Sequence, residues 1–108
     1  GKMAVIGLTN TLAKEWGALN ITVNAVAFGP IETRLVSEFE DSPGSIQIQG
    51  REHKVGLSKE LRASISAQSS LGRFGTPAEA AGAVYLLCIP ESDYITGQVL
   101  VCAGGASL

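Results

Sequence analysis

The first sixteen residues show the hydrophobic spacing of an amphipathic helix. Between residues 3 and 16, large apolar side chains recur every three or four positions, at Val5, Leu8, Leu12 and Trp16. Residues with this spacing share one face of a helix. Gly17 follows directly, and glycine readily adopts the left-handed conformation that ends many helices. The pattern therefore predicts a helix over 3–16 that stops at Gly17.

The next apolar segment is typical of a strand. Residues 21–27 read ITVNAVA, a β-branched run without charges. Such runs indicate strands that are buried on both faces, as in parallel sheets. A turn at 28–33 follows the carboxyl end of this strand. Ligands of open α/β sheets bind just outside that end, so the turn is where chemistry is expected.

The middle of the chain has a different pattern. Residues 36–57 combine Ser, Gly, Gln, one Pro and mixed charges with weak periodicity, which predicts a long loop. Loops longer than about 12–15 residues are usually functional lids or disordered segments. Residues 58–67 can form a short helix with Ser58 as its N-cap.

A further helix is predicted after residue 75. Thr76 suits the N-cap, Pro77 the first helical position, and Glu79 completes a capping box with Thr76. The helix should end near Ile89, because Pro90 disfavours helical geometry in the residue before it.

The last apolar run completes an α/β pattern. Residues 98–102 (QVLVC) predict a second buried strand, and Gly104–Gly105 predict a structural turn, since no helix follows them to make a phosphate site. The element order is helix, strand, long loop, helix, strand, and strands joined by such crossovers are parallel. Two parallel strands need further sheet beside them. Because the sequence also enters a helix at once from Gly1–Lys2, we expect a piece of a longer protein.

Composition excludes several classes of protein. The 108 residues are 45% hydrophobic and 17% charged, unlike disordered segments, which are polar and highly charged. No apolar run approaches the roughly 18 residues of a membrane-spanning helix, and no secretory signal is recognisable. The net charge of −2 gives no reason to expect a nucleic acid or an anionic membrane as partner.

Few side chains suggest other chemistry. Cys88 and Cys102 lie in apolar runs without metal-type spacing, so buried free thiols are expected rather than a disulfide or a nucleophile. The only histidine, His53, is expected to be a solvated loop residue rather than a catalytic base, and no cluster suggests a metal site. Arg73 is either an anchor for a subunit or loop contact or a simple surface residue.

Two segments carry a family resemblance. AVIGLTNTLAKEWGALNITVNAVAFGPIETRL and LGRFGTPAEAAGAVYLLCIPESDYITGQVLVCAGG, within residues 2–35 and 70–105, resemble the C-terminal part of a short-chain dehydrogenase/reductase. They are most similar to the 3-oxoacyl-[acyl-carrier-protein] reductases of fatty acid biosynthesis. The resemblance implies that residues 1–108 are the C-terminal part of one doubly wound Rossmann domain, with residues 36–70 as its substrate lid. It implies hydride transfer between NADP or NAD and a carbonyl or alcohol carbon, and reduction of a 3-oxoacyl thioester.

The resemblance assigns a catalytic role to Lys2. The family's motif is Tyr-x-x-x-Lys at the start of the helix before an ITVNAV-type strand, and Lys2 matches its lysine. The tyrosine would lie four positions earlier, before this sequence begins. Positions four apart share a helix face, so the ammonium can lower the pKa of the phenol, which then exchanges a proton with the substrate oxygen. The lysine would also hold the nicotinamide ribose. From composition alone, a solvated surface lysine is the alternative.

The turn after the first strand resembles the family's Pro-Gly-x-Ile-x-Thr. Gly29, Ile31 and Thr33 match, whereas Phe28 replaces the usual proline and Pro30 fills the variable place. The resemblance implies that backbone groups of Ile31 hold the nicotinamide carboxamide and that the Thr33 hydroxyl binds the cofactor. Backbone and small donors suit a ring that must leave one face open to the substrate.

The resemblance also sets the expected partners. They are a small-molecule or acyl-thioester substrate and a second copy of the protein, in a dimer or homotetramer built through the helix over 3–16 and the final helix and strand. A cytoplasmic location, or an organelle such as the mitochondrion, is expected. The isolated 108 residues should be inactive, because the tyrosine and the glycine-rich phosphate turn are missing. Two alternatives remain open: a truncated product with a role in assembly, and a polyol, sugar or steroid dehydrogenase of the same family.

Overall fold

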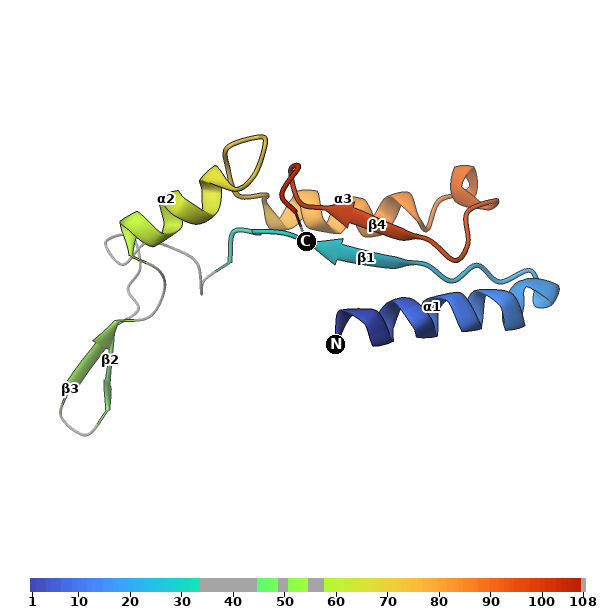
Figure 1. Cartoon of the computed structure of the whole chain (residues 1–108), viewed down its shortest axis with the longest axis horizontal. Helices are drawn as coiled ribbons and strands as arrows, with labels where there is room; N and C mark the ends of the chain where they lie inside the picture. The colour runs from blue at the N-terminus through green and yellow to red at the C-terminus, as the bar shows by residue number, and fades with distance from the viewer. Residues whose placement is uncertain (34–44, 49–50, 55–57, 108) are drawn as a thin grey trace. The chain divides into compact units, whose positions relative to one another are not determined.

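The computed structural model describes residues 1–33, 45–48, 51–54 and 58–107 of the chain (Figure 1). They form two compact units, each of which is described by itself. The first unit is Gly1–Phe28 with Ala78–Cys102, and the second is Gly29–Pro77 with Ala103–Leu108. None of the helices in these described stretches is long and apolar enough to cross a membrane.

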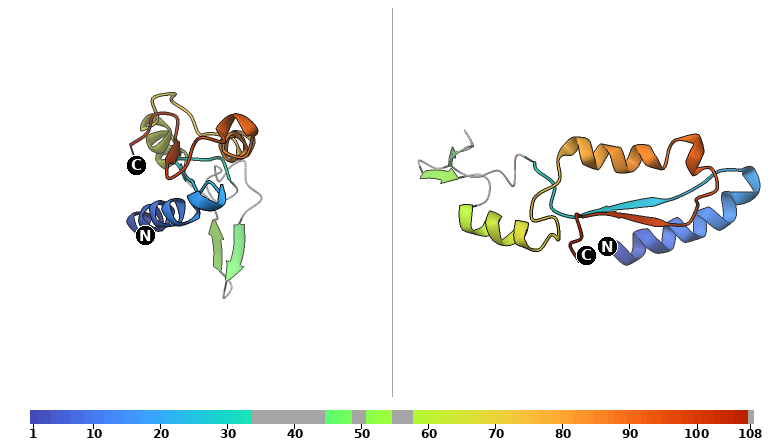
Figure 2. Two further views of the ribbon diagram at one scale, coloured as in Figure 1. Left: turned by 90° about the vertical axis from the view of Figure 1, so that its right-hand side faces the viewer. Right: turned by 90° about the horizontal axis from the view of Figure 1, so that it is seen from above.

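The first unit is a small α/β layer structure. Its elements are α1 (Lys2–Trp16), η1 (Gly17–Leu19), β1 (Ala25–Phe28), α3 (Pro77–Leu86, from Ala78 on), η3 (Pro90–Ser92) and β4 (Val99–Cys102). β1 and β4 pair in parallel, with Ala25 opposite Val99 and Phe28 opposite Cys102. α1 lies on one side of the two strands and α3 on the other (Figure 2). The predicted α/β class with parallel strands is confirmed.

The predicted first helix is confirmed, but its proposed stop is not. α1 ends at Trp16, yet Gly17 is right-handed, with φ −57° and ψ −38°. The chain continues into η1, and the left-handed residue is Asn20, with φ 60°. Its N–H donates to the carbonyl of Gly17 at 2.9 Å, which closes the tight turn. Asparagine tolerates this conformation better than most residues. The left-handed residue is therefore Asn20, three positions after the predicted Gly17.

The first strand is shorter and less buried than predicted. β1 begins at Ala25, because the residues before it use side-chain partners. The N–H of Val23 donates to Oγ1 of Thr96, and Asn24 accepts from the N–H of Gln98, both at 3.0 Å. Burial on both faces is not observed: Ala25–Ala27 are half-buried and Phe28 is exposed. The strand presents apolar surface that the described residues leave partly uncovered.

The second half of this unit follows the predicted order with shifted ends. α3 starts at Pro77 as expected but ends at Leu86, short of Ile89. The two residues between them donate to carbonyls three positions back, at 3.1 and 2.9 Å, which tightens the helix end. Ile89 is extended, with φ −87° and ψ 158°, as expected before Pro90. β4 confirms the predicted strand over 98–102, starting one residue later.

The two cysteines only partly follow expectation. Both are free, but Cys88 is exposed and Cys102 is half-buried. The predicted burial of Cys88 is wrong, because it lies in the turn beyond α3, where the chain has left the helix.

The second unit holds a hairpin that the sequence did not predict. β2 (Ser45–Ile48) and β3 (Arg51–Lys54) pair antiparallel, with Ser45 opposite Lys54. The predicted uninterrupted loop over 36–57 is therefore wrong at these residues, and His53 belongs to a strand. The other parts of that loop, 36–44, 49–50 and 55–57, lie outside the described residues. The alternation in Ser-Ile-Gln-Ile is only four residues long, too short to stand out among polar neighbours.

The predicted short helix after this segment is confirmed. α2 spans Lys59–Ala67, and the hydroxyl of Ser58 accepts a hydrogen bond from the N–H of Leu61 at 3.2 Å. This is the N-cap contact that satisfies one of the free amide groups at a helix start.

Candidate cofactor site

Lys2 is the first residue of α1 and its side chain is exposed. No side chain caps this helix start, but the carbonyl of Gly1 accepts from the amides of Ala4 and Val5 at 3.1 and 3.2 Å. Lys2 borders a groove of about 190 Å³ whose other walls are apolar and come from Val5, Ile6, Ala25, Val26, Ala27 and Val99. An ammonium beside such a groove can bind a polar group placed at its rim.

Gly29 opens the turn in the second unit, and its packing explains why glycine is needed. A Cβ at this position would lie 2.6 Å from the Cβ of Ala103 and 2.8 Å from its Cα. Ala103 is itself buried. No side chain fits here without moving backbone, so Gly29 allows the turn to pass directly against the segment after β4.

The backbone of the turn is fixed by a parallel bridge between Ile31 and Gly75. Gly75 donates its N–H to the carbonyl of Pro30 at 2.9 Å, and its carbonyl accepts from the N–H of Glu32 at 2.7 Å. In a parallel bridge of this pattern the partner uses the two neighbours of the central residue. The N–H and carbonyl of Ile31 itself therefore point to the opposite side.

Thr33 follows at the end of this described stretch. It is exposed, so its hydroxyl is accessible to a ligand. An amide donor, a carbonyl acceptor and a hydroxyl thus occur within three residues, on a backbone that Gly75 holds in place. This set fits a carboxamide, which carries both a donor and an acceptor.

Gly104 and Gly105 form the structural turn that the sequence predicts. Both have positive φ, 60° and 89°, which side chains other than glycine rarely adopt. The hydroxyls of Ser69 and Ser70 donate to their carbonyls. The turn is held by carbonyl acceptors rather than by amide groups aimed at a ligand, so its role is structural.

The four predicted site residues fall in two places. Lys2 belongs to the first unit, and Gly29, Ile31 and Thr33 lie together in the second unit. Arg73 makes a local loop contact, because its Nη1 donates to the carbonyl of Phe74 at 3.0 Å. Within the described ranges, no group of three or more His, Cys, Asp or Glu residues could hold a metal ion.

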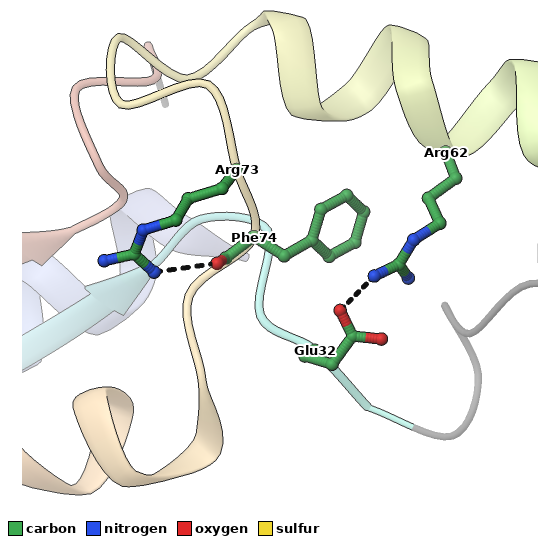
Figure 3. Close-up of polar contacts among 4 residues, drawn as sticks. All are labelled: Glu32, Arg62, Arg73 and Phe74. Atoms are coloured by element: carbon green, nitrogen blue, oxygen red, sulfur yellow. Dashed lines mark hydrogen bonds and ion pairs between the residues drawn. The ribbon is translucent and has the colours of Figure 1, made fainter.

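Sequence reasoning missed two residues next to this turn. Glu32 occupies a variable place of the motif, and Arg62 is an unremarked position of α2. The two side chains form an ion pair across 30 residues of sequence (Figure 3). No local pattern could have indicated it, because only the folded chain brings α2 to the turn.

A family profile described as enoyl-(acyl carrier protein) reductase matches residues 1–107. The fold also matches a solved short chain dehydrogenase from Bacillus anthracis, with a TM-score of 0.71 and 36% sequence identity over 99% of this chain. The chain belongs to the short-chain dehydrogenase/reductase family. Its α/β fold is part of the Rossmann-type domain of that family.

Named relatives of this short-chain dehydrogenase/reductase chain carry different descriptions. A tropinone reductase homolog of Arabidopsis thaliana, described as chloroplastic, is 38% identical over 99% of the chain, and that match covers 28% of the relative. The 3-oxoacyl-[acyl-carrier-protein] reductase FabG of Aquifex aeolicus is 38% identical over 96% of the chain and 35% of the relative.

Among solved structures, a 4-hydroxyisoleucine dehydrogenase complexed with NADH has a TM-score of 0.72 and 28% identity. That match covers 96% of this chain and 36% of the dehydrogenase. The chain thus spans about a third of the length of the relatives described above.

Proposed function

We propose that residues 1–108 are the C-terminal part of a single Rossmann-type dehydrogenase/reductase domain, with residues 36–70 as its substrate lid. The complete enzyme transfers a hydride between a nicotinamide cofactor and a carbonyl or alcohol carbon. The share of about one third that the chain covers in its relatives supports this division. So does β1, whose apolar residues are only half-buried by the described chain.

The backbone of Ile31 is the observation that carries the proposal. The bridge to Gly75 turns the N–H and carbonyl of Ile31 away from Gly75, and these groups match the carboxamide of a nicotinamide. Gly29 brings the backbone close, and the Thr33 hydroxyl supplies a further polar contact. NADP or NAD would supply the hydride, and a structural relative with bound NADH favours this cofactor class.

Lys2 would act from the start of α1. Its exposed ammonium beside an apolar groove suits two tasks: to hold the ribose hydroxyls of the cofactor, and to lower the pKa of a tyrosine phenol one helical turn earlier. A phenol with a lowered pKa can exchange a proton with the substrate oxygen near neutral pH.

A 3-oxoacyl thioester is the proposed substrate, because FabG reductases from Aquifex aeolicus and Thermotoga maritima are 38% identical to this chain. A second candidate is a small ketone or alcohol, as in polyol, sugar or steroid dehydrogenases. The similarity to a tropinone reductase homolog and a 4-hydroxyisoleucine dehydrogenase favours it.

The test is a substrate panel on the full-length protein that contains residues 1–108. NADPH or NADH oxidation should be fastest with an acetoacetyl thioester and slower with small cyclic ketones. Preference for a small ketone would favour the second candidate. No oxidation of either nucleotide with any substrate would favour a non-catalytic assembly role.

Assembly into a dimer or homotetramer is part of the proposal. α1 exposes Met3, Val5 and Leu8, and α3 exposes Tyr85 and Leu86, with exposed fractions between 54% and 77%. α3 and β4 also border an apolar groove of about 480 Å³. Exposed apolar surface of this kind marks association sites. Sedimentation of the full-length protein and of a Tyr85→Glu variant would test it.

The proposed location is the cytoplasm or an organelle. The description of one relative as chloroplastic supports an organelle as one of these two locations. Fractionation with an antibody against the native protein would decide between them.

A further inference from the structure

Arg62 has two partners at the same time in the second unit. Its guanidinium forms an ion pair with the carboxylate of Glu32, and its Cζ lies 4.5 Å from the centroid of the Phe74 ring (Figure 3). The Arg62 and Glu32 side chains are 20% and 40% exposed. Arginine suits this arrangement, because its planar group can stack on a ring while its edge donates to a carboxylate.

Both partners belong to one fixed piece of backbone. Phe74 is buried, with 6% of its surface exposed, and it directly precedes Gly75 of the parallel bridge. Glu32 donates its N–H to the carbonyl of Gly75 at 2.7 Å. Arg62 therefore contacts both strands of this bridge: it pairs with the side chain of Glu32 on the turn and stacks on the ring of Phe74 on the facing segment.

Arg62 itself is held on α2. Its N–H donates to the carbonyl of Ser58 at 2.9 Å, and the hydroxyl of Ser58 caps the helix. The guanidinium is thus the connection between a regular, capped helix and the turn. Glu32 lies between Ile31 and Thr33, the two residues of the proposed cofactor contact. A change in the position of the Glu32 side chain therefore also shifts the backbone of these two neighbours.

We infer that Arg62 is a positioning residue for the nicotinamide turn, acting through Glu32 and Phe74; this inference rests on the proposed function. Arg62 does not touch the cofactor. It adds side-chain contacts to the Ile31–Thr33 backbone that Gly75 already holds, and it couples that backbone to α2. By linkage, a ligand that orders the turn must also stabilise the docking of α2.

The test compares Arg62→Met, Arg62→Lys, Glu32→Gln and the double variant Arg62→Met/Glu32→Gln in the full-length reductase. The matched control is Lys59→Met, which removes an exposed cation from the same helix. Arg62→Met should raise the Kd and KM for NADPH or NADH by about fivefold, the effect expected for a partly exposed pair plus ring stacking, while kcat changes less than about twofold. Arg62→Lys should recover part of the loss.

The double variant gives the coupling. If Arg62 acts through Glu32, the fold-increase in cofactor Kd of the double variant should be smaller than the product of the fold-increases of the two single variants. A second readout needs no turnover: hydrogen exchange of the α2 amides should slow when NADH binds to the wild type, and this response should disappear in Arg62→Met. Cofactor affinity is followed by the fluorescence of the reduced nicotinamide.

Each outcome decides a different claim. Unchanged cofactor affinity in Arg62→Met, or fully multiplicative single effects, would overturn the positioning role. If Arg62→Met does not fold, the same criteria apply to Arg62→Lys and Glu32→Gln. If the wild type neither binds nor oxidises a nicotinamide cofactor, the proposed function and the cofactor role of Arg62 both fail. In that case, faster hydrogen exchange of the α2 amides in cofactor-free Arg62→Met than in the wild type would support only a structural role of Arg62, which connects α2 to the turn.

Discussion

The hydroxyl of Ser69 donates to the carbonyl of Gly104 at 2.9 Å, whereas that of its neighbour Ser70 donates to Gly105 at 3.4 Å. Ser69 is buried and its Oγ also accepts from the N–H of Leu71 at 3.2 Å, while Ser70 is exposed. Ser69 thus holds Gly104 with a shorter hydrogen bond and one further contact, whereas the hydrogen bond from Ser70 to Gly105 is long and exposed.

Replacement of Ser69 by alanine should therefore destabilise the fold. The change removes the two hydrogen bonds of the Ser69 hydroxyl, while the amide of Leu71 and the carbonyl of Gly104 stay paired with each other at 3.0 Å. The free energy of unfolding should therefore fall by about 0.5–1.5 kcal/mol. Ser70→Ala is the matched control and should cost less than about 0.5 kcal/mol. Urea unfolding measures both, and equal costs would contradict the assigned roles.

A methyl group at Gly29 should disturb the turn. Its Cβ would meet the backbone of Ala103 at 2.8 Å, and relief of such overpacking costs about 1–3 kcal/mol. We expect Gly29→Ala to lower stability by this amount and to weaken binding of NADPH or NADH, as followed by urea unfolding and nucleotide fluorescence.

Gly17→Ala is the control for that experiment. Gly17 is right-handed and a Cβ there meets nothing within 4 Å. Alanine at such a site loses less conformational entropy on folding, so stability should rise by about 0.4–1 kcal/mol. A destabilised Gly17→Ala would show that this position has contacts beyond the described chain.

Loss of the ammonium at residue 2 should impair turnover. In the full-length protein, Lys2→Ala is expected to lower the kcat of the proposed reaction by about 10²-fold or more, the usual scale of acid–base catalysis. Lys14→Ala, at the other end of α1 and also exposed, should leave kcat unchanged. Steady-state kinetics and circular dichroism of both variants test this, and normal turnover of folded Lys2→Ala would reject the role of Lys2.

The 108 residues alone should not catalyse hydride transfer. The motif tyrosine and the glycine-rich phosphate turn are not among them, so neither the proton donor nor the pyrophosphate contacts are supplied. NADPH oxidation with an acetoacetyl thioester should equal the rate without protein. A rate above that background would show that these residues hold a sufficient site.

Short-range patterns predicted the helices and the parallel strands but not the hairpin of β2 and β3. The stripe from Val5 to Trp16 and the Pro77 start gave α1 and α3 because helix periodicity and proline geometry are local properties. The stop at Gly17 was wrong because several residues can take the left-handed position, and the turn closed at Asn20 instead.

Long-range pairs could not be predicted from the sequence. The contact of Arg62 with Glu32 and Phe74 depends on the placement of α2 beside the turn, and nothing near Arg62 in the sequence encodes it. The turn itself was indicated by its motif. The bridge that orients Ile31 could not be predicted, because its partner Gly75 lies 44 positions later in a segment without strand character.

The pairing of β1 with β4 has a consequence for how the chain acquires its fold. The hydrogen bond between Asn24 and Gln98 joins residues 74 positions apart, so β1 emerges during synthesis long before its partner strand exists. Closing so long a loop slows folding. Until β4 is synthesised, the edge of β1 that pairs with it carries unpaired N–H and carbonyl groups to which other chains can bind. Removal of the last ten residues would leave this edge without β4.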